Sequence, residues 1–499
     1  MADSKGTQPD ILSVARQHFG FDSLRPGQEQ AIRSVLSGRD TVLVQPTGAG
    51  KSAIYQIAGL MIHGVTVVIS PLIALQKDQV DSINEANASE AVLVNSQLRA
   101  AEHREVIDKI EDGQVEYIFL APEQLRNKET IERLEASGIS LFVVDEAHCI
   151  SGWGHDFRPD YLQLGQAIER FGHPRVLAMT ATASPEMRQE IIERLGLRNP
   201  KVFVHGFDRP NIHLRVDHFQ TEKEKTEALI RRIQFAPKPG IVYVASRRNA
   251  ESIMRSLTEL GVHALFYHAG LKAQEREAIQ EQFMSGDAEV MVATNAFGMG
   301  VDKSDIRFVY HFDISDSLDS YYQEIGRAGR DGEAAEAVLF FRTENVGTQK
   351  FRTGRGKGAA AQAAKVAEII AGTEGLITPT ELVEKTGLAL RTLTTVLHRL
   401  QDAGAIVLLP SGEVQLAKGA NLVEAAEGAS QQQELHKEHR CEKLRQMQEY
   451  ADSRSCRREI VLRYFGDDAV VVCHNCDNCE SNVGKLPAGS AAGTRREVV

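Results

Sequence analysis

The chain has 499 residues, of which 42% are hydrophobic and 25% charged, and its formal net charge is −11. That length predicts three or four domains, and the acidic balance argues against a protein that coats nucleic acid by bulk charge, although local basic patches stay compatible with DNA contacts. We find no run near the roughly 18 apolar residues of a membrane span and no secretory pattern at the N-terminus, so we expect a cytoplasmic protein without a membrane partner.

Residues 1–206 alternate short apolar runs with longer amphipathic segments. This alternation predicts an α/β domain in which crossover helices join the strands of a parallel sheet. The expected strands are Thr41–Gln45, Val65–Ser70, Tyr117–Ala121, Leu141–Asp145 and Val176–Thr180.

A glycine-rich segment follows the first of these strands and precedes a helix, which is the setting of a phosphate-binding loop. Backbone N–H groups of such a loop close around phosphate oxygens, Lys51 reaches the β/γ-phosphates, and Ser52 ligates Mg²⁺. Gln45 stands where the strict pattern has glycine. The predicted nucleotide-binding residues of this loop are Thr47, Gly48, Ala49, Gly50, Lys51 and Ser52.

Two carboxylates, Asp145 and Glu146, end the expected strand Leu141–Asp145. We expect Asp145 to hold Mg²⁺ through water and Glu146 to polarise the attacking water. The next residues include the only tryptophan of the chain, and such an aromatic and basic loop suits stacking on unpaired bases. Its predicted DNA-binding residues are Trp153, His155, Phe157 and Arg158.

An adenine site is predicted upstream, around Phe21, Arg25 and Gln28. A glutamine amide offers the donor and acceptor that match the adenine edge, and an aromatic ring with an arginine can sandwich the base. An ordinary helix start is the alternative interpretation of the same residues.

Residues 207–345 repeat the α/β pattern. Near its end, Arg327 and Arg330 are three residues apart, which predicts that they lie on one helical face. Two such arginines can stabilise charge on a transferring phosphoryl group, and a solvated basic helix is the alternative. The expected strands lie near Gly240–Val244, His263–Tyr267, Val290–Thr294, Phe308–Phe312 and Ala337–Phe341.

The character of the sequence changes after residue 345. Residues 346–362 form a small, basic linker, and residues 363–418 predict three helices (Lys365–Ala371, Pro379–Thr386, Leu390–Ala403) and a hairpin, the order of a winged helix. Its third helix offers Arg391 and Arg399, with Thr392, Thr394, Thr395 and His398, for duplex DNA. A protein-interaction module and a rigid spacer are the alternatives.

Residues 435–482 hold a cysteine cluster, and residues 483–499 predict a disordered tail. Cys456, Cys473, Cys476 and Cys479 contain two overlapping C-x-x-C steps, which favour one structural Zn²⁺ with four protein ligands. Reactive or redox thiols are the alternative interpretation of this cluster. Cys441 is an alternative ligand, although we expect it to be an ordinary thiol. Cys149 is expected to be a packing residue.

Together these motifs resemble superfamily 2 helicases, and specifically the RecQ family of DNA helicases. The resemblance covers most of residues 12–345 and residues 440–480. Further segments that carry it are Leu24–Gln28, Ser70–Leu75, Asp145–His148, Thr180–Thr182, Phe207–Ile212, Tyr267–Leu271, Ala296–Gly300 and Tyr321–Gly332.

The resemblance implies two RecA-like parallel-sheet lobes and a small helical zinc-binding module, with ATP, Mg²⁺ and Zn²⁺ as cofactors. It implies Arg330 as the arginine finger, Arg327 as a second phosphate contact, and an aromatic loop that couples single-strand binding to hydrolysis. Activity would be 3′-to-5′ unwinding of tailed or branched DNA in recombination and repair, with nucleoid association and single-strand-binding or recombination proteins as partners.

The chain departs from the family pattern at its C-terminal end. The family's winged helix usually follows the zinc module, whereas here the winged-helix-like segment precedes it and 20 residues follow Cys479. The element that separates the strands is therefore open. A DNA-stimulated ATPase that remodels protein–DNA complexes with little unwinding is the alternative function. A DNA-binding regulator with degenerate lobes is disfavoured by the intact Lys51, Asp145, Glu146 and Arg330.

Overall fold

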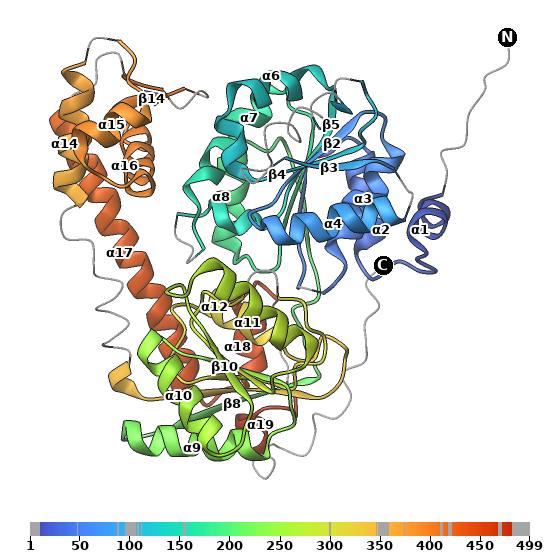
Figure 1. Cartoon of the computed structure of the whole chain (residues 1–499), viewed down its shortest axis with the longest axis vertical. Coiled ribbons are helices and arrows are strands. Elements are labelled where there is room, and N and C mark those ends of the chain that lie inside the picture. The colour runs from blue at the N-terminus through green and yellow to red at the C-terminus, as the bar shows by residue number, and fades with distance from the viewer. Residues whose placement is uncertain are drawn as a thin grey trace. The chain divides into compact units, whose positions relative to one another are not determined.

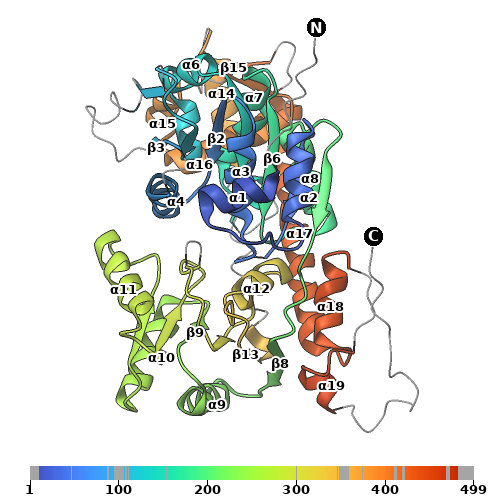
Figure 2. The same ribbon diagram turned by 90° about the vertical axis from the view of Figure 1, so that its right-hand side faces the viewer.

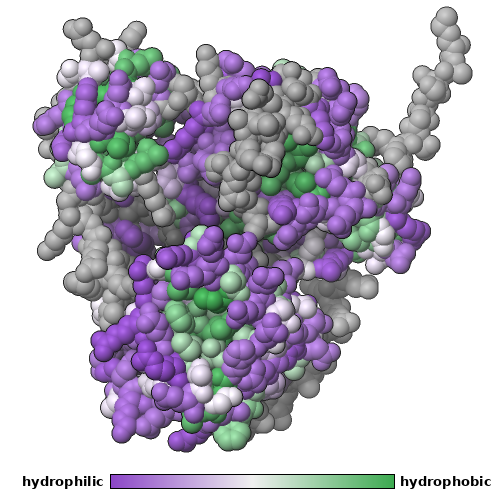
Figure 3. Space-filling model, in the orientation of Figure 1, coloured by the Kyte–Doolittle hydropathy of each residue, from purple (hydrophilic) through white to green (hydrophobic). Residues whose placement is uncertain are grey.

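The computed structural model describes residues 10–46, 48–86, 89–94, 106, 109–110, 112–152, 156–298, 301–345, 347, 359–373, 375–409, 413–417, 422–467 and 472–481. The chain forms two compact units. The first comprises Met1–Phe207 and Thr348–Leu444, and the second comprises Asp208–Gly347 and Arg445–Val499. Hydrophilic residues cover most of the described surface visible in Figure 3.

The first unit contains a seven-stranded parallel sheet in the order β3-β4-β2-β5-β6-β1-β7 (Figure 1). Its strands are β1 (Thr41–Val44), β2 (Val65–Ile69), β3 (Ala91–Val94), β4 (Tyr117–Leu120), β5 (Ile139–Val144), β6 (Arg175–Thr180) and β7 (Lys201–Val204). Its α-helices are α1 (Ile11–Phe19), α2 (Gln28–Leu36), α3 (Lys51–Met61), α4 (Ile73–Glu85), α6 (Lys128–Ala136), α7 (Leu164–Arg170) and α8 (Pro185–Leu195). The short 3₁₀ turns are η1 (Pro122–Arg126), η2 (Ala147–Ile150) and η3 (Pro159–Gln163).

This strand order places three candidate functional segments side by side at the carboxyl ends of the sheet's strands. The phosphate loop follows β1, Thr180 ends β6, and Asp145 follows β5, and these three strands are neighbours. The four residues of β1 and the last four of β5 are buried, as expected for parallel strands covered on both faces. Carboxyl ends of adjacent parallel strands form the usual crevice for ligands in such sheets.

The second unit contains a six-stranded parallel sheet in the order β10-β11-β9-β12-β13-β8. Its strands are β8 (Ile212–His218), β9 (Gly240–Tyr243), β10 (Ala264–Tyr267), β11 (Val290–Ala293), β12 (Phe308–His311) and β13 (Ala335–Phe341). Its helices are α9 (Glu222–Phe235), α10 (Arg247–Glu259), α11 (Ala273–Ser285), α12 (Leu318–Ile325), α18 (Arg457–Tyr464) and α19 (Asp477–Ser481). The buried core joins α9 and α10 to the central strands, with Leu229, Ile253 and Phe308 among its members.

Helices α18 and α19 lie against β8, the edge strand of this sheet (Figure 2). Leu214 of β8 forms an isolated parallel bridge with Cys476, and the Val216 N–H donates to Asp477 Oδ2 at 3.0 Å. The cysteine-rich segment therefore pairs with backbone groups of an edge strand that would otherwise be open to other strands.

Three helices and a two-stranded antiparallel sheet follow the second lobe, and they belong to the first unit. They are α14 (Ala359–Ala371), α15 (Pro379–Thr386), α16 (Leu390–Asp402), β14 (Ile406–Leu408) and β15 (Val414–Leu416). Val366, Leu382, Leu397 and Ile406 contribute to their own apolar core. A 31-residue helix, α17 (Leu422–Asp452), follows (Figure 1).

The predicted parallel α/β lobes are confirmed, with all ten expected strands present within two residues of their predicted ends. Strands β3, β7 and β8 were not predicted. The expected linker 346–362 overlaps α14, which begins at Ala359 because the alanine-rich run favours a helix. Among the described residues, none of the helices combines the length and apolar character that crossing a membrane requires.

Candidate nucleotide site, aromatic loop and metal centre

The phosphate loop has the backbone that its glycines allow. Gly48 and Gly50 have φ of 83° and 81°, a left-handed conformation that side-chain-bearing residues rarely adopt, and α3 begins directly after them at Lys51. Lys51 Nζ donates to the carbonyl oxygens of Gln45 at 3.0 Å and Pro46 at 3.4 Å. The ammonium group thus lies over its own loop at a helix N-terminus, where phosphate oxygens are favoured. Thr47 lies outside the described residues.

Two of the predicted adenine-site residues contact this loop. Gln28 Nε2 donates to the carbonyl oxygen of Gly50 at 2.8 Å, and the Arg25 guanidinium donates to the carbonyl of Gly48. Gln28 Oε1 also accepts from the Arg25 backbone N–H at 2.7 Å. Phe21 is 38% exposed and stacks on Phe19 with ring centroids 5.9 Å apart. Arg25 and Gln28 are therefore fixed beside the phosphate loop. The ring of Phe21, four residues before Arg25, is exposed to solvent.

The two carboxylates form a strained, negatively charged pair after β5. Glu146 has φ of 47°, which is uncommon for a residue with a side chain, and its N–H donates to Asp145 Oδ1 at 2.9 Å. Burial and the charge of Glu146 raise the pKa of Asp145 to about 6, against the lowering effect of Lys51. Asp145 Oδ2 is 3.5 Å from Ser70 Oγ, a long contact.

These carboxylates fit a divalent cation. Within the described part of the chain, Glu146 Oε2 is buried and makes no hydrogen bond. Adjacent carboxylate oxygens of this kind are the donors that Mg²⁺ prefers, and the cation would supply charge to phosphate oxygens when bound.

His148 links the carboxylates to the aromatic loop, which we define as Ser151–Arg158. Its Nδ1 is 2.9 Å from Thr180 Oγ1 and 3.3 Å from Glu146 Oε2, and its Nε2 is 3.6 Å from Asp156 Oδ2. Burial opposes the charged ring, but Cys149 and Asp156 raise the pKa of His148 well above its ordinary value. Burial also opposes a charged Glu146, yet its contact with His148 lowers the pKa of Glu146 overall. The two groups thus stabilise each other as an ion pair.

The aromatic loop is anchored at both ends. The Ser151 hydroxyl and the Gly152 N–H donate to the two carboxylate oxygens of Glu190 in α8. At the other end, Arg158 Nη1 donates to the carbonyl of Pro71 at 2.9 Å, and the Arg158 N–H donates to the carbonyl of Cys149 at 2.9 Å. Trp153 and His155 lie outside the described residues, and Phe157 and Arg158 are half-buried. The described contact of Arg158 is thus to the protein backbone.

A tyrosine behind the loop contacts the carboxylate segment directly. Tyr161 of η3 is fully buried, and its hydroxyl donates to the Asp145 carbonyl oxygen at 2.9 Å. Sequence reasoning missed Tyr161, Asp156 and Glu190. Asp156 lies within the aromatic loop but received no role, Tyr161 and Glu190 belong to no recognisable motif, and only the three-dimensional packing brings Glu190 to the loop.

In the second unit, Arg327 and Arg330 lie in consecutive turns, not on a helical face. Helix α12 ends at Ile325, Gly326 caps it, and Gly329 has φ of 56°. The expected helical presentation was wrong, because α12 ends before Arg327 and the left-handed conformation of Gly329 does not fit a continuing helix. We name Gly326–Arg330 the arginine turns. Arg327 donates to the Gly298 carbonyl, and Arg330 Nη1 donates to the Val301 carbonyl at 3.0 Å and to Asp302 at 2.6 Å.

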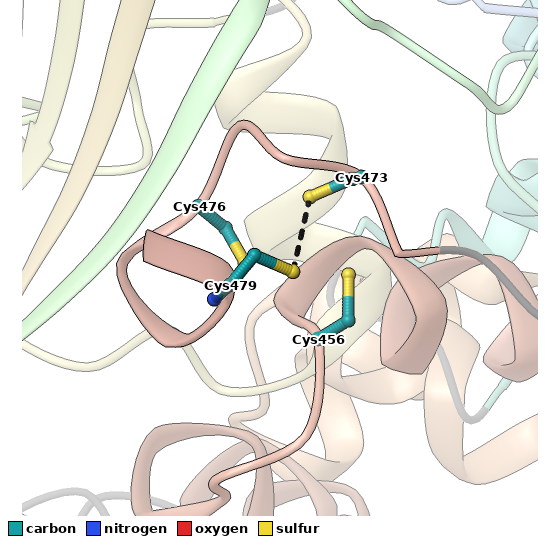
Figure 4. Close-up of side chains that lie close together, drawn as sticks. All are labelled: Cys456, Cys473, Cys476 and Cys479. Atoms are coloured by element: carbon teal, nitrogen blue, oxygen red, sulfur yellow. Dashed lines mark hydrogen bonds between the residues drawn. The ribbon is translucent and has the colours of Figure 1, made fainter. Parts of the chain in front are cut away.

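The cysteines come together as a candidate metal centre (Figure 4). The Sγ atoms of Cys456, Cys473, Cys476 and Cys479 all lie within 4.8 Å of one another, and those of Cys473 and Cys479 are 3.9 Å apart. A tetrahedral Zn²⁺ with Zn–S bonds of about 2.3 Å requires S···S separations of roughly 3.8 Å. Backbone N–H groups of Asn475 and Cys479 donate to cysteine sulfurs, as expected for thiolates. The four cysteines fit Zn²⁺ without Cys441.

A buried ion pair joins the two helices that carry this metal centre. The Arg457 guanidinium donates to both carboxylate oxygens of Asp477, at 3.0 and 3.2 Å, and also to the carbonyls of Tyr450 and Ala451. Arg457 is 3% exposed. An arginine–carboxylate pair between α18 and α19 thus holds the described cysteine cluster together.

The third helix of the winged-helix-like module does not present all its predicted contact residues. Thr394 and His398 are buried, and α16 packs against η3. Burial and the charge of Arg440 lower the pKa of Arg399, which is half-buried. The side chain of Arg391 lies outside the described residues.

Three family models match separate parts of the chain. The DEAD/DEAH box helicase model matches residues 25–191, the helicase conserved C-terminal domain matches residues 224–332, and the RecQ zinc-binding model matches residues 416–480. The last match begins before the predicted module boundary at 435 and includes all of α17.

Relatives of known name extend over nearly the whole chain. It is 37% identical over 474 residues to "ATP-dependent DNA helicase RecQ" of Haemophilus influenzae, covering 95% of this chain and 64% of the relative. It is 35% identical over 469 residues to the protein of the same name in Bacillus subtilis, covering 94% and 66%. The chain thus spans slightly less than two thirds of each relative's length.

A solved structure supports the same fold. Mycobacterium smegmatis helicase Lhr bound to single-stranded DNA and AMP-PNP matches with a TM-score of 0.55 and 18% identity, covering 84% of this chain and 63% of that chain. At that identity the likeness shows the two-lobed fold alone. The three family models in this order, the relatives and the cysteine cluster together show that the chain belongs to the RecQ family of helicases.

Proposed function

We propose that this chain is an ATP-dependent 3′-to-5′ DNA helicase of RecQ type. The observation that carries the proposal is the series of contacts from Glu146 through His148 to Asp156, because it joins a nucleotide site to a candidate DNA-binding loop. The names of the relatives support DNA as the substrate, and the direction of movement rests on the family resemblance.

In the proposed reaction, Lys51 and the loop N–H groups hold the β/γ-phosphates, and Ser52 and Asp145 hold the Mg²⁺ shell. Arg25, Gln28 and Phe21 bind the adenine. Glu146 orients the attacking water, and its neighbour His148 fixes the direction of its carboxylate. These assignments agree with the placement of Lys51, Gln28 and Asp145 around one phosphate loop.

The role proposed for Arg330 and Arg327 is to stabilise negative charge on the γ-phosphoryl group. Burial, together with the charge of Arg327, lowers the pKa of Arg330. Two buried guanidinium groups with few charged partners gain more from an incoming phosphate than exposed ones would, because the low dielectric strengthens the attraction.

Coupling is proposed to run through the aromatic loop. Bases stacked on Trp153 and Phe157 shift the loop, and Asp156 and Tyr161 transmit the shift to His148 and to the Asp145 backbone. Because Glu146 already contacts His148, a movement of a few tenths of an ångström changes the position of the water-activating oxygen. DNA then raises the rate of hydrolysis.

The winged-helix-like module is proposed to act as an internal support more than as a duplex reader. Its third helix packs against η3, directly after the aromatic loop, and two of the six residues predicted to contact DNA are buried. Recombination and single-strand-binding proteins as partners, and nucleoid association, stay predictions.

Strand displacement on a 3′-tailed duplex tests the proposed function. With ATP, we expect displacement from the 3′-tailed substrate and little from a 5′-tailed duplex of the same sequence. Robust DNA-stimulated hydrolysis without displacement of either substrate would instead support the protein–DNA remodelling ATPase.

A further inference from the structure

The segment Asp208–Asn211, which leads into β8, contacts two separate parts of the second unit. On one side it touches the arginine turns, and on the other it touches the cysteine cluster and α18. We call this segment the connector. It has no catalytic group of its own in the proposed reaction, so its contacts call for another explanation.

The connector holds the arginine turns by donating to their carbonyl oxygens. Arg209 Nη1 donates to Gly326 at 3.1 Å, and its Nη2 donates to Ala328 at 2.8 Å and Gly329 at 2.9 Å. Asn211 Nδ2 donates to Gly329 at 2.8 Å and to Glu333 at 2.9 Å. These five bonds fix the backbone on both sides of Arg327 and directly before Arg330.

The fit around Gly329 is close. A methyl group at Gly329 would lie 2.5 Å from Asn211 Nδ2 and 2.7 Å from the Glu333 carbonyl oxygen. The turn therefore follows the position of the connector, because neither can move far without breaking bonds to the other.

Arg458 holds the connector from the other side. It is 5% exposed, its Nη1 donates to Asp208 Oδ1 at 2.6 Å, and its Nη2 donates to the Ile212 carbonyl at 2.8 Å. Asn475, between two of the cysteines, donates to the Pro210 carbonyl at 2.8 Å. Charge-assisted bonds of this kind are short and directional, and Arg458 makes them to the first residue of the connector and to the residue directly after it.

We propose that Arg458 of the zinc-binding module is a positioning residue for Arg327 and Arg330, acting through the connector. The proposal rests on the proposed function, since it deepens the role of the two arginines. Arg458 also contacts Cys473 of the cysteine cluster, whereas its described hydrogen bonds toward the arginine turns end at Asp208 and Ile212. Its effect on hydrolysis would thus pass through Asp208, Ile212 and then Arg209.

Steady-state hydrolysis of Arg458→Ala and Arg458→Lys tests this role, with Arg463→Ala as the matched control on the same helix. Arg463 makes an exposed pair with Glu459, and its side chain is 61% exposed. We expect the DNA-stimulated kcat of Arg458→Ala to fall about tenfold with the KM for ATP nearly unchanged. Arg458→Lys, which keeps the charge but not both bonds, should fall less, and the control should match the parent.

Hydrogen exchange and zinc content provide the second readout. In Arg458→Ala, amides of residues 326–333 should exchange faster than in the parent while one zinc per chain is kept. Unchanged exchange and kcat in both Arg458 variants would overturn the proposal. Loss of zinc from Arg458→Lys together with loss of kcat would also overturn it, because the role would then be structural. A parent without DNA-stimulated turnover would refute the proposed function, whereas the exchange result decides the positioning separately.

Discussion

The described residues of the aromatic loop and the arginine turns both lie outside helices and strands, but different interactions hold them. The aromatic loop is held by ionisable groups: Glu190 accepts at one end, and Asp156 of the loop faces His148 of η2. The arginine turns are fixed mainly through backbone carbonyls that accept from Arg209 and Asn211. Charged groups respond to a ligand, whereas saturated carbonyl contacts resist movement.

This difference teaches which part should move when DNA binds. The aromatic loop is held by charged side chains, and its Asp156 contacts the buried Glu146–His148 ion pair. A bound anion or base can therefore shift its position. Turns held by four hydrogen bonds from one connector are suited to keep a fixed geometry for phosphate. The predictions below perturb one region while leaving the other intact.

The largest effect is expected from Lys51→Ala, which removes the phosphate-binding ammonium without touching either region. Hydrolysis should fall by at least about a hundredfold, with and without DNA, because the positive charge that stabilises the transferring phosphate is lost. Phosphate release measured with saturating single-stranded DNA checks this. Turnover that survives in this variant would mean that the nucleotide site lies elsewhere.

Zinc removal should affect the second region and spare the first. Chelation is expected to destabilise the second unit by more than about 3 kcal/mol, since the four thiolates then repel and the cover of β8 is lost. Calorimetry should show a lower transition for one unit and an unchanged transition for the other. A chain that binds no zinc by metal analysis would contradict the cysteine assignment.

Glu190→Ala should loosen the aromatic loop and leave the arginine turns alone. The two donors at Ser151 and Gly152 lose their acceptor, so we expect DNA stimulation of hydrolysis to fall about tenfold while basal turnover changes little. Turnover titrated with single-stranded DNA measures both quantities. Glu193→Ala, on the same helix and outside the loop contacts, is a control that should behave like the parent.

The smallest effect is expected from Cys441→Ser. Cys441 lies on α17 and outside the group of four sulfurs, so zinc content and stability should match the parent. Metal analysis of the purified variant checks this, and a loss of one zinc per chain would return Cys441 to the ligand set.

Sequence reasoning found motifs whose residues are close together in the chain and missed contacts between distant segments. Lys51, Asp145 and the four cysteines were predicted from local motifs, and the structure brings the four cysteine sulfurs together while the roles of Lys51 and Asp145 stay predictions. Glu190 and Arg458 carry none, because their partners lie 38 or more residues away. Their roles depend on tertiary packing, which no local pattern encodes.

Backbone detail also exceeded what the pattern could give. The spacing of Arg327 and Arg330 fits a helix, but α12 ends at Ile325 and Gly329 has a positive φ. Hydrogen bonds from Arg209, distant in the sequence, then hold the backbone in turns. Strand β8 alternates buried and partly exposed residues along a polar sequence, so its hydrophobic signal was weak. It is stable at the sheet edge because the cysteine-rich segment covers it.

The central claim is that the aromatic loop couples DNA binding to the carboxylate pair, and Trp153→Ala tests it most directly. ATP turnover should be measured for this variant and the parent, without DNA and with saturating single-stranded DNA. The account predicts equal basal turnover and loss of most of the DNA stimulation, because the stacking surface is gone while Asp145, Glu146 and His148 stay in place. Equal stimulation in the variant and the parent would contradict it.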